Sequence, residues 1–125
     1  MRNFVKSLRL DDQGTTAVEF AIVAPVFIAL LIGTLALCVG LFLIGSLHFA
    51  VEDAARCASV KTAICSDAPT TVAYAQNHYF GPNVSPTFTY AAAACGNSVS
   101  ASISYSMNVG FRTFTIPISA TACFP

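Results

Sequence analysis

The sequence predicts an α+β protein. We expect a long N-terminal transmembrane helix continuing into an amphipathic stalk, then a small exported domain with a second helix and a disulfide-closed antiparallel β-hairpin or small sheet. Three observations predict this class: an uncharged apolar run over residues 20–45, alternating polar and apolar residues near the C-terminus, and four cysteines outside the apolar run. With 125 residues, the chain has room for one membrane segment and one small domain.

The apolar run, 26 residues from Phe20 to Gly45, can cross a bilayer as one helix at about 1.5 Å per residue. The cations Arg2, Lys6 and Arg9 precede it, and positive residues close to a membrane helix tend to stay in the cytoplasm. We therefore expect a cytoplasmic N-terminus and an exported body. The run exceeds the roughly 7 to 15 apolar residues of a secretory signal, so we expect the helix to be retained.

Composition and motifs exclude several functions. The formal net charge is zero, and no basic cluster recurs beyond the N-terminal cations, so we do not expect a nucleic-acid partner. No serine elbow, paired carboxylate motif or glycine-rich phosphate loop is present, so we expect neither an enzyme nor a cofactor. His48 and His78 match no zinc spacing with the cysteines, so we expect no metal site.

Helical spacing predicts that the first helix extends to about Ala63, with Pro25 kinking but not ending it. Glu52 and Arg56 are spaced for an i, i+4 ion pair. The apolar positions of the stalk recur at three and four residues: Leu47, Ala50, Val51, Ala54 and Ala58.

A second helix is predicted after the break at "CSDAPTT". Ser66 or Asp67 can cap it, Pro69 suits its first turn, and it should end near Tyr79, before "GPN". The aromatic residues around this helix and the first strand are interpreted as core: Tyr74, Tyr79, Phe80, Phe88 and Tyr90.

Beyond Val84 the pattern predicts strands. "SVSASISYSMNVGFRTFTIPISAT" alternates small polar with apolar residues around a turn at 108–110, which indicates a β-hairpin. A third strand is predicted around residues 87–90. Pro117 lacks a backbone donor and indicates that its strand lies at an edge.

If the hairpin is centred on Val109, facing residues have numbers that add up to 218, as those of Cys95 and Cys123 do. A disulfide there would leave Cys57 and Cys65 to pair with each other, although other pairings stay open at this point. Cys38 is expected within the bilayer as a free, packed thiol.

Small residues recur along the membrane helix at spacings of four, three and four: Ala29, Gly33, Ala36 and Gly40. Such a stripe permits close approach of a partner helix. The alternative is that alanine and glycine are simply common in membrane helices.

The segment "GTTAVEFAIVAPVF", together with "VEDAARCAS" in the stalk, resembles the TadE-like minor pilins, or pseudopilins, of the tight-adherence (Tad, Flp) type IVb pilus system. The basic leader, the glycine, and a glutamate and an aromatic residue before an apolar helix carry the resemblance. It is strongest over residues 14–58 and covers the cysteine-bearing hairpin more weakly.

The resemblance implies that a prepilin peptidase cuts between Gly14 and Thr15. Glu19 would become the fifth mature residue, next to Phe20, and attract the free amine of a neighbouring subunit during assembly. The implied segments are a leader at 1–14, an assembly helix at 15–46 and a periplasmic stalk and domain at 47–125.

The resemblance also implies partners and a location. The partners are the prepilin peptidase, other pilins, the Tad inner-membrane assembly components and the membrane itself. The location is the bacterial inner membrane, with incorporation into a cell-surface pilus that supports adhesion. The alternative is a permanently membrane-anchored periplasmic scaffold or binding component of an envelope complex.

Overall fold

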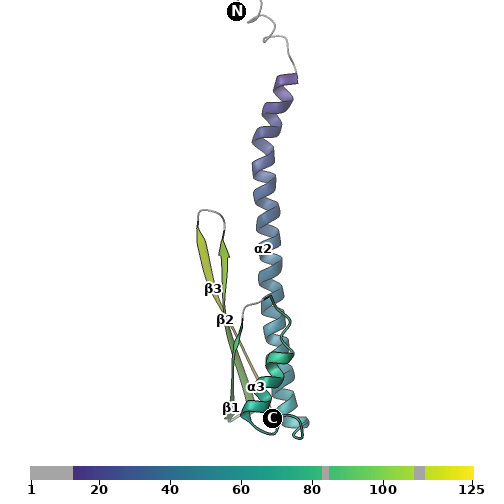
Figure 1. Cartoon of the computed structure of the whole chain (residues 1–125), viewed down its shortest axis with the longest axis vertical. Helices are drawn as coiled ribbons and strands as arrows, with labels where there is room; N and C mark the ends of the chain where they lie inside the picture. The colour runs from purple at the N-terminus through teal and green to yellow at the C-terminus, as the bar shows by residue number, and fades with distance from the viewer. Residues whose placement is uncertain (1–12, 83–84, 109–111) are drawn as a thin grey trace, which may run out of the picture. The chain divides into compact units, whose positions relative to one another are not determined.

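The computed structural model describes residues 13–82, 85–108 and 112–125 (Figure 1). The elements follow in the order α2 (Gln13–Val60), α3 (Ala68–Asn77), β1 (Thr87–Ala93), β2 (Gly96–Asn108) and β3 (Thr113–Phe124). They confirm the predicted α+β class. The chain divides into two units, Met1–Leu37 and Cys38–Pro125, and each is described by itself.

Helix α2 is 48 residues long and continues through Pro25, so this proline does not end it, as predicted. It stops at Val60, three residues before the predicted end. There the backbone N–H of Lys61 donates to the carbonyl of Cys57, and Lys61 in turn accepts from Ile64 and Cys65, so the chain turns toward α3.

Helix α3 begins as the sequence predicts. Asp67 is its N-cap, Pro69 lies in the first turn, and the helix ends at Asn77 with His78 as C-cap. The carboxylate of Asp67 accepts from the N–H of Thr70 at 2.9 Å, and the Thr70 hydroxyl accepts from the Asp67 N–H at 3.1 Å. This reciprocal capping box satisfies donors that would otherwise lack partners at the helix start.

The three strands form one antiparallel sheet in the order β1-β2-β3. Strand β1 confirms the predicted third strand and extends it to Ala93. Because β3 is an edge strand, the missing donor of Pro117 interrupts no ladder toward a further strand, as predicted.

The predicted register of the β2–β3 hairpin is wrong by three residues. Paired residues have numbers that add up to 221, so Ser98, not Cys95, lies opposite Cys123. The strands end at Asn108 and Thr113, which leaves a four-residue connection in place of the predicted three-residue turn. The predicted turn centre, Val109, lies outside the described residues.

The core lies in the unit Cys38–Pro125, where one face of α2 contributes buried residues together with the sheet and α3. Four of the five predicted stalk positions are fully buried, and Ala58 is half-buried. The buried cluster comprises Leu43, Leu47, Ala50, Val51, Ala54 and Ala55 from α2, Ala75 from α3, and Phe88, Val99, Ala101, Ile103, Ile118 and Ala120 from the sheet.

Two further predictions about this unit fail. Phe80 is 62% exposed, unlike the other four aromatic residues, which are buried or packed against the core. Its backbone N–H donates to the hydroxyl of Ser46, so the contact made here is through the main chain. The side chains of Glu52 and Arg56, both exposed, form no ion pair, because an exposed i, i+4 pair gains only about 0.3 to 0.5 kcal/mol in water.

Candidate functional site

The segment predicted for processing and assembly lies in the first turns of α2. Gly14, Thr15, Glu19 and Phe20 are all exposed, and Phe20 is exposed at 74%. Within the described residues the Glu19 carboxylate has no hydrogen-bond or ion-pair partner. It is therefore available to a group on another molecule. The cations Arg2, Lys6 and Arg9 lie outside the described residues.

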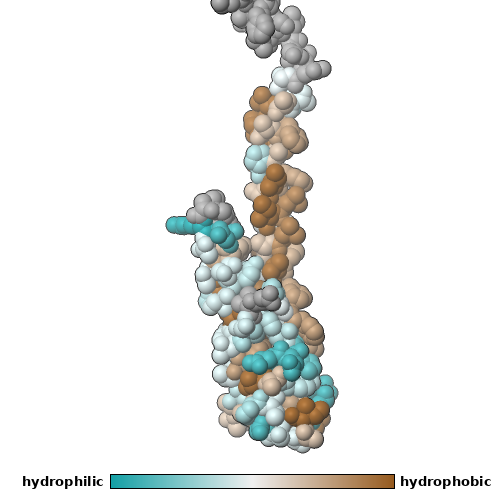
Figure 2. All heavy atoms as spheres, viewed as in Figure 1, coloured by the Kyte–Doolittle hydropathy of each residue, from teal (hydrophilic) through white to brown (hydrophobic). Residues whose placement is uncertain are grey.

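Among the described residues, one helix, Gly14–Val60, is long and apolar enough to cross a membrane. Only 6% of its most apolar 18-residue window is buried, whereas the core helix of a soluble protein would be covered. Figure 2 shows apolar surface along this part of α2. Within the apolar run, the Thr34 hydroxyl bonds back to the carbonyl of Leu31 at 2.9 Å, so it is satisfied without water.

The small residues proposed for helix packing are open to a partner. Ala29 and Gly33 are exposed, and Ala36 and Gly40 are partly exposed. No atom lies within 4 Å of the position that a Cβ would take at Gly33 or Gly40. A second helix could therefore approach the backbone closely here, and its presence stays a prediction.

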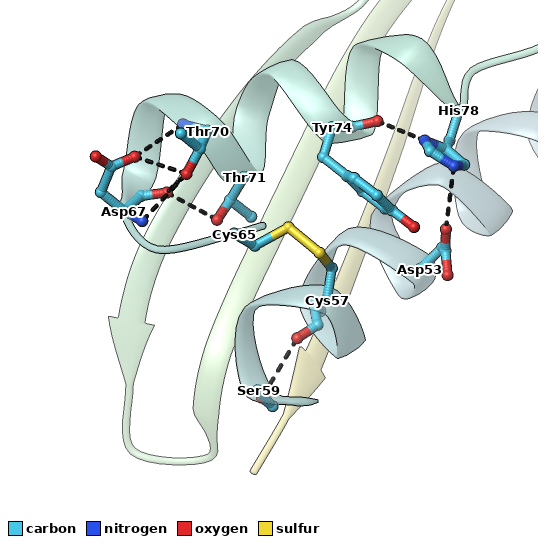
Figure 3. Close-up of a disulfide and its surroundings, with 10 residues drawn as sticks. Asp53, Cys57, Ser59, Cys65, Asp67, Thr70, Thr71, Tyr74 and His78 are labelled. Atoms are coloured by element: carbon cyan, nitrogen blue, oxygen red, sulfur yellow. Dashed lines mark hydrogen bonds and ion pairs between the residues drawn. A yellow bond between two sulfur atoms is a disulfide. The ribbon is translucent and has the colours of Figure 1, made fainter. Parts of the chain in front are cut away.

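Both predicted disulfides form. Cys57 near the end of α2 is bonded to Cys65, just before the cap of α3 (Figure 3). Cys95, in the turn between β1 and β2, is bonded to Cys123 near the end of β3. Cys38 is free, as predicted, but exposed rather than packed, because no other part of the described chain covers its side chain.

A polar contact between α2 and the C-cap residue of α3 was not predicted. Nε2 of His78 lies 3.8 Å from the carboxylate of Asp53, while Nδ1 lies 2.9 Å from the carbonyl of Tyr74 (Figure 3). The ring of His78 stacks on that of Tyr74, with centroids 4.0 Å apart. The i, i+4 spacing of Tyr74 and His78 was the one available sequence signal, and it does not point to Asp53.

The base of the sheet is fixed to α2 by a second unpredicted group. The amide of Asn97 donates to the hydroxyl of Ser59 at 2.9 Å, and the Ser59 hydroxyl lies 3.1 Å from the carbonyl oxygen of Phe124, to which it can donate. The Tyr90 hydroxyl donates to Oδ1, the carbonyl oxygen of the same Asn97 side chain. These contacts join residues far apart in sequence, so no local sequence pattern predicts them.

The histidines and cysteines are not brought together. His48 is exposed and His78 faces Asp53. Four of the cysteines form the two disulfides: Cys57, Cys65, Cys95 and Cys123. No group of three or more His, Cys, Asp or Glu side chains in the described part of the chain could hold a metal ion.

Together these features define a protein with one membrane-capable helix and a small disulfide-bonded α+β domain. Residues 14–56 match the family described as TadE-like protein, a pilin-like structural family associated with Tad pili. This match confirms the resemblance seen in the motif. The match begins at Gly14, the first residue of the segment predicted for processing, ends one residue before Cys57 and covers about a third of the chain. No curated protein and no solved structure matches the chain.

Proposed function

We propose that this protein is a minor pilin, or pseudopilin, that takes part in the assembly or initiation of a Tad-type type IVb pilus and so supports adhesion. The observation that carries the proposal is that the family match and the G-x-x-x-x-E-F motif begin at the same residue, Gly14, just before the uncharged apolar run. A cut after Gly14 by a prepilin peptidase leaves Thr15 as the first residue of a helix.

The exposed carboxylate of Glu19 supports a role in assembly. A charge at the centre of a bilayer costs roughly 2.5 to 3.5 kcal/mol on insertion scales, and less near the interface, where Glu19 would lie. The free amine of Thr15 on a neighbouring subunit would recover part of this cost. Phe20 and the small residues of α2 would then pack against neighbouring pilin helices.

The proposal includes the topology and the partners. The leader 1–14 lies in the cytoplasm, helix 15–46 crosses the bacterial inner membrane, and 47–125 lies in the periplasm until the subunit joins a pilus. The prepilin peptidase acts first. Other pilins and the Tad inner-membrane assembly components then receive the processed chain.

Incorporation of a Glu19→Gln variant tests this role, with Glu52→Gln as the matched control. Both residues are exposed acids on α2 without an ion-pair partner in the described chain. We expect both variants to insert into the membrane, and Glu19→Gln alone to be depleted at least about tenfold from sheared pili or Tad assembly complexes, since a lost ion pair of about 1.4 kcal/mol gives that factor. Normal incorporation of Glu19→Gln would contradict the proposal and favour a permanently anchored scaffold.

A further inference from the structure

Both edges of the sheet are open to another strand. Strands β1 and β3 form these edges, and no further strand pairs with either in the part of the chain that the structure describes. Neither strand carries a charged side chain, and no bulge interrupts its register. Natural sheets protect their edges with charges, prolines or bulges, because unpaired backbone groups otherwise pair with another chain. Here Pro117 alone gives such protection, and it lies on β3.

The two unprotected edges match in length, level and direction. Beyond Pro117, β3 continues over residues 118–124, which lie opposite residues 97–103 of β2. Strand β1, seven residues long, lies opposite residues 96–102 of β2. Both edge strands run in the same direction, because each is antiparallel to β2. A second copy placed beside the first in the same orientation would therefore bring its β1 alongside β3.

The direction of the main-chain groups along β3 follows from Pro117. A proline in an edge strand has its nitrogen on the open side, so Pro117 and every second residue after it turn their main-chain groups away from β2. Thr121 is one of these residues. Its hydroxyl donates to that of Ser100, its partner on β2, at 3.1 Å. This short side-chain contact agrees, because side chains come closest in pairs that lack main-chain hydrogen bonds.

The main-chain groups of β1 then complement those of β3. Ser100, which has no main-chain bond to Thr121, turns its main-chain groups toward Thr89, its partner on β1. The neighbours of Thr89, Phe88 and Tyr90, therefore turn theirs toward the open edge. In a parallel ladder one residue donates to the residue before its partner and accepts from the residue after it. Thr121 of one copy can do this with β1 of the next, with Thr89 as its partner.

The space beside β3 suits such a neighbour. A groove of about 540 Å³ lies between α2 and the end of β3, and Glu52 and Arg56 line it without an ion-pair partner in the described chain. Helices α2 and α3 cover the same face of the sheet (Figure 3), and α3 contacts β1. An added copy therefore brings its α3 to the α2 side of this groove. The exposed residues of α3 are all uncharged, so none repels Glu52 or Arg56: Ala68, Pro69, Thr70, Ala73, Gln76 and Asn77.

We propose that the open edge of β3 binds the β1 edge of a second copy of this chain, so that the two sheets continue as one. The junction is heterologous, because the added copy offers its own β3 to a third copy. Pairing of β3 with β3 of a second copy would instead turn the copies in opposite directions, whereas copies anchored in one membrane share a direction. The proposal rests on membrane anchoring and on neither leader cleavage nor Glu19.

Disulfide cross-linking of the full chain in detergent tests the proposal. All variants carry Cys38→Ala, since Cys38 is the free cysteine. Thr89→Cys and Thr121→Cys chains are purified separately, mixed and oxidised mildly, and peptide mass spectrometry identifies the new bond and the intact native disulfides. Thr89→Cys mixed with Ser106→Cys is the control. Ser106 is exposed on the same sheet face but lies about 20 Å along β2 from the partner of Thr89.

We expect the mixed Thr89→Cys and Thr121→Cys dimer to be the main product, well above the yield of the control mixture. Two outcomes would overturn the proposal. In the first, Thr121→Cys chains cross-link mainly to one another, which indicates that β3 pairs with β3. In the second, the mixed dimer does not exceed the control, which indicates that a second copy does not occupy the edge. Neither outcome bears on processing, since no peptidase and no pilus is present.

A proline pair tests the main-chain contact without any new cysteine. Thr121→Pro removes one donor from the open edge and spares the β2–β3 ladder, as Pro117 does. Thr115→Pro is the matched control, because Thr115 has the same outward direction but lies beyond the level of β1. Sedimentation equilibrium in detergent should show self-association weakened about tenfold by Thr121→Pro and less than about twofold by Thr115→Pro. Equal effects of the two variants would contradict the proposed junction.

Discussion

Asn97 and Ser59 lie 38 residues apart in sequence, and the side-chain amide of Asn97 donates to the Ser59 hydroxyl across 2.9 Å. Ser59 also lies within hydrogen-bond distance of the carbonyl of Phe124, so one residue of α2 contacts the start of β2 and the end of β3. The contact fixes the height of the hairpin along α2. Both Ser59 and Asn97 are half-buried, so water replaces these bonds poorly.

Ser59→Ala removes the acceptor of the Asn97 amide. We expect a loss of about 1 to 2 kcal/mol in the free energy of unfolding, because a partly buried donor is left without a partner. Chemical unfolding of the full chain in detergent measures this change. Ser106→Ala is the control. Ser106 is exposed on the face of β2 that points away from the core, so this change should alter stability by less than about 0.5 kcal/mol. Equal effects of the two variants would show that the Ser59 bonds contribute nothing specific.

Gly96 and Gly45 should respond to alanine with opposite signs. Gly96 has φ of 118°, and a Cβ there would overlap with the carbonyl oxygen of Phe124. Gly96→Ala should therefore cost about 2 kcal/mol or more. No atom lies within 4 Å of a Cβ at Gly45, in the interior of α2, so Gly45→Ala should stabilise the helix by up to about 1 kcal/mol. Thermal unfolding of the two variants tests both expectations. A Gly96→Ala protein as stable as the wild type would contradict the turn geometry.

The two disulfides should differ in their rates of reduction. Cys57 and Cys65 are 2% and 4% exposed, whereas Cys95 is exposed and Cys123 half-buried. An attacking thiolate must reach a sulfur atom, so the Cys95–Cys123 bond should be reduced first in the folded protein. Limited reduction followed by alkylation and peptide mass spectrometry gives the order. Earlier labelling of Cys57 and Cys65 would mean that the end of α2 opens more readily than the sheet.

The capping box of α3 should make stability depend on pH. The side-chain hydrogen bond from Thr70, and then its backbone N–H, lower the pKa of Asp67 from its ordinary value of 3.8. A lowered folded pKa contributes stability that is present above 3.8 and is lost as the pH falls through the folded value. The unfolding midpoint should therefore drop more steeply in the wild type than in Asp67→Asn, which keeps a good N-cap without titrating. If the unfolding midpoints of the wild type and Asp67→Asn fell in parallel between pH 6 and pH 2, this prediction would be contradicted.

Local signals predicted the elements of this fold well. The uncharged run gave α2, Asp67 and Pro69 gave the start of α3, and Pro117 gave the edge position of β3. Each depends on residues within a few positions of one another. The exposed state of Glu19 also agrees with a role outside its own chain.

Features that depend on distant partners were predicted poorly. The pairing of Cys95 with Cys123 is correct although the register behind it is not, because Cys95 lies in the turn three residues before the strand partner of Cys123. The turn signal at 108–110 gave no indication of a longer connection. Asp53 lies near His78, the C-cap residue of α3, which no spacing within α2 indicates.

The first residue of the natural mature protein tests the central claim most directly. Intact-mass measurement and N-terminal sequencing should be made on protein from cells that contain the prepilin peptidase, and on protein expressed without it. We predict Thr15 as the first residue in the presence of the peptidase and Met1 in its absence. Met1 as the first residue in both preparations would contradict it.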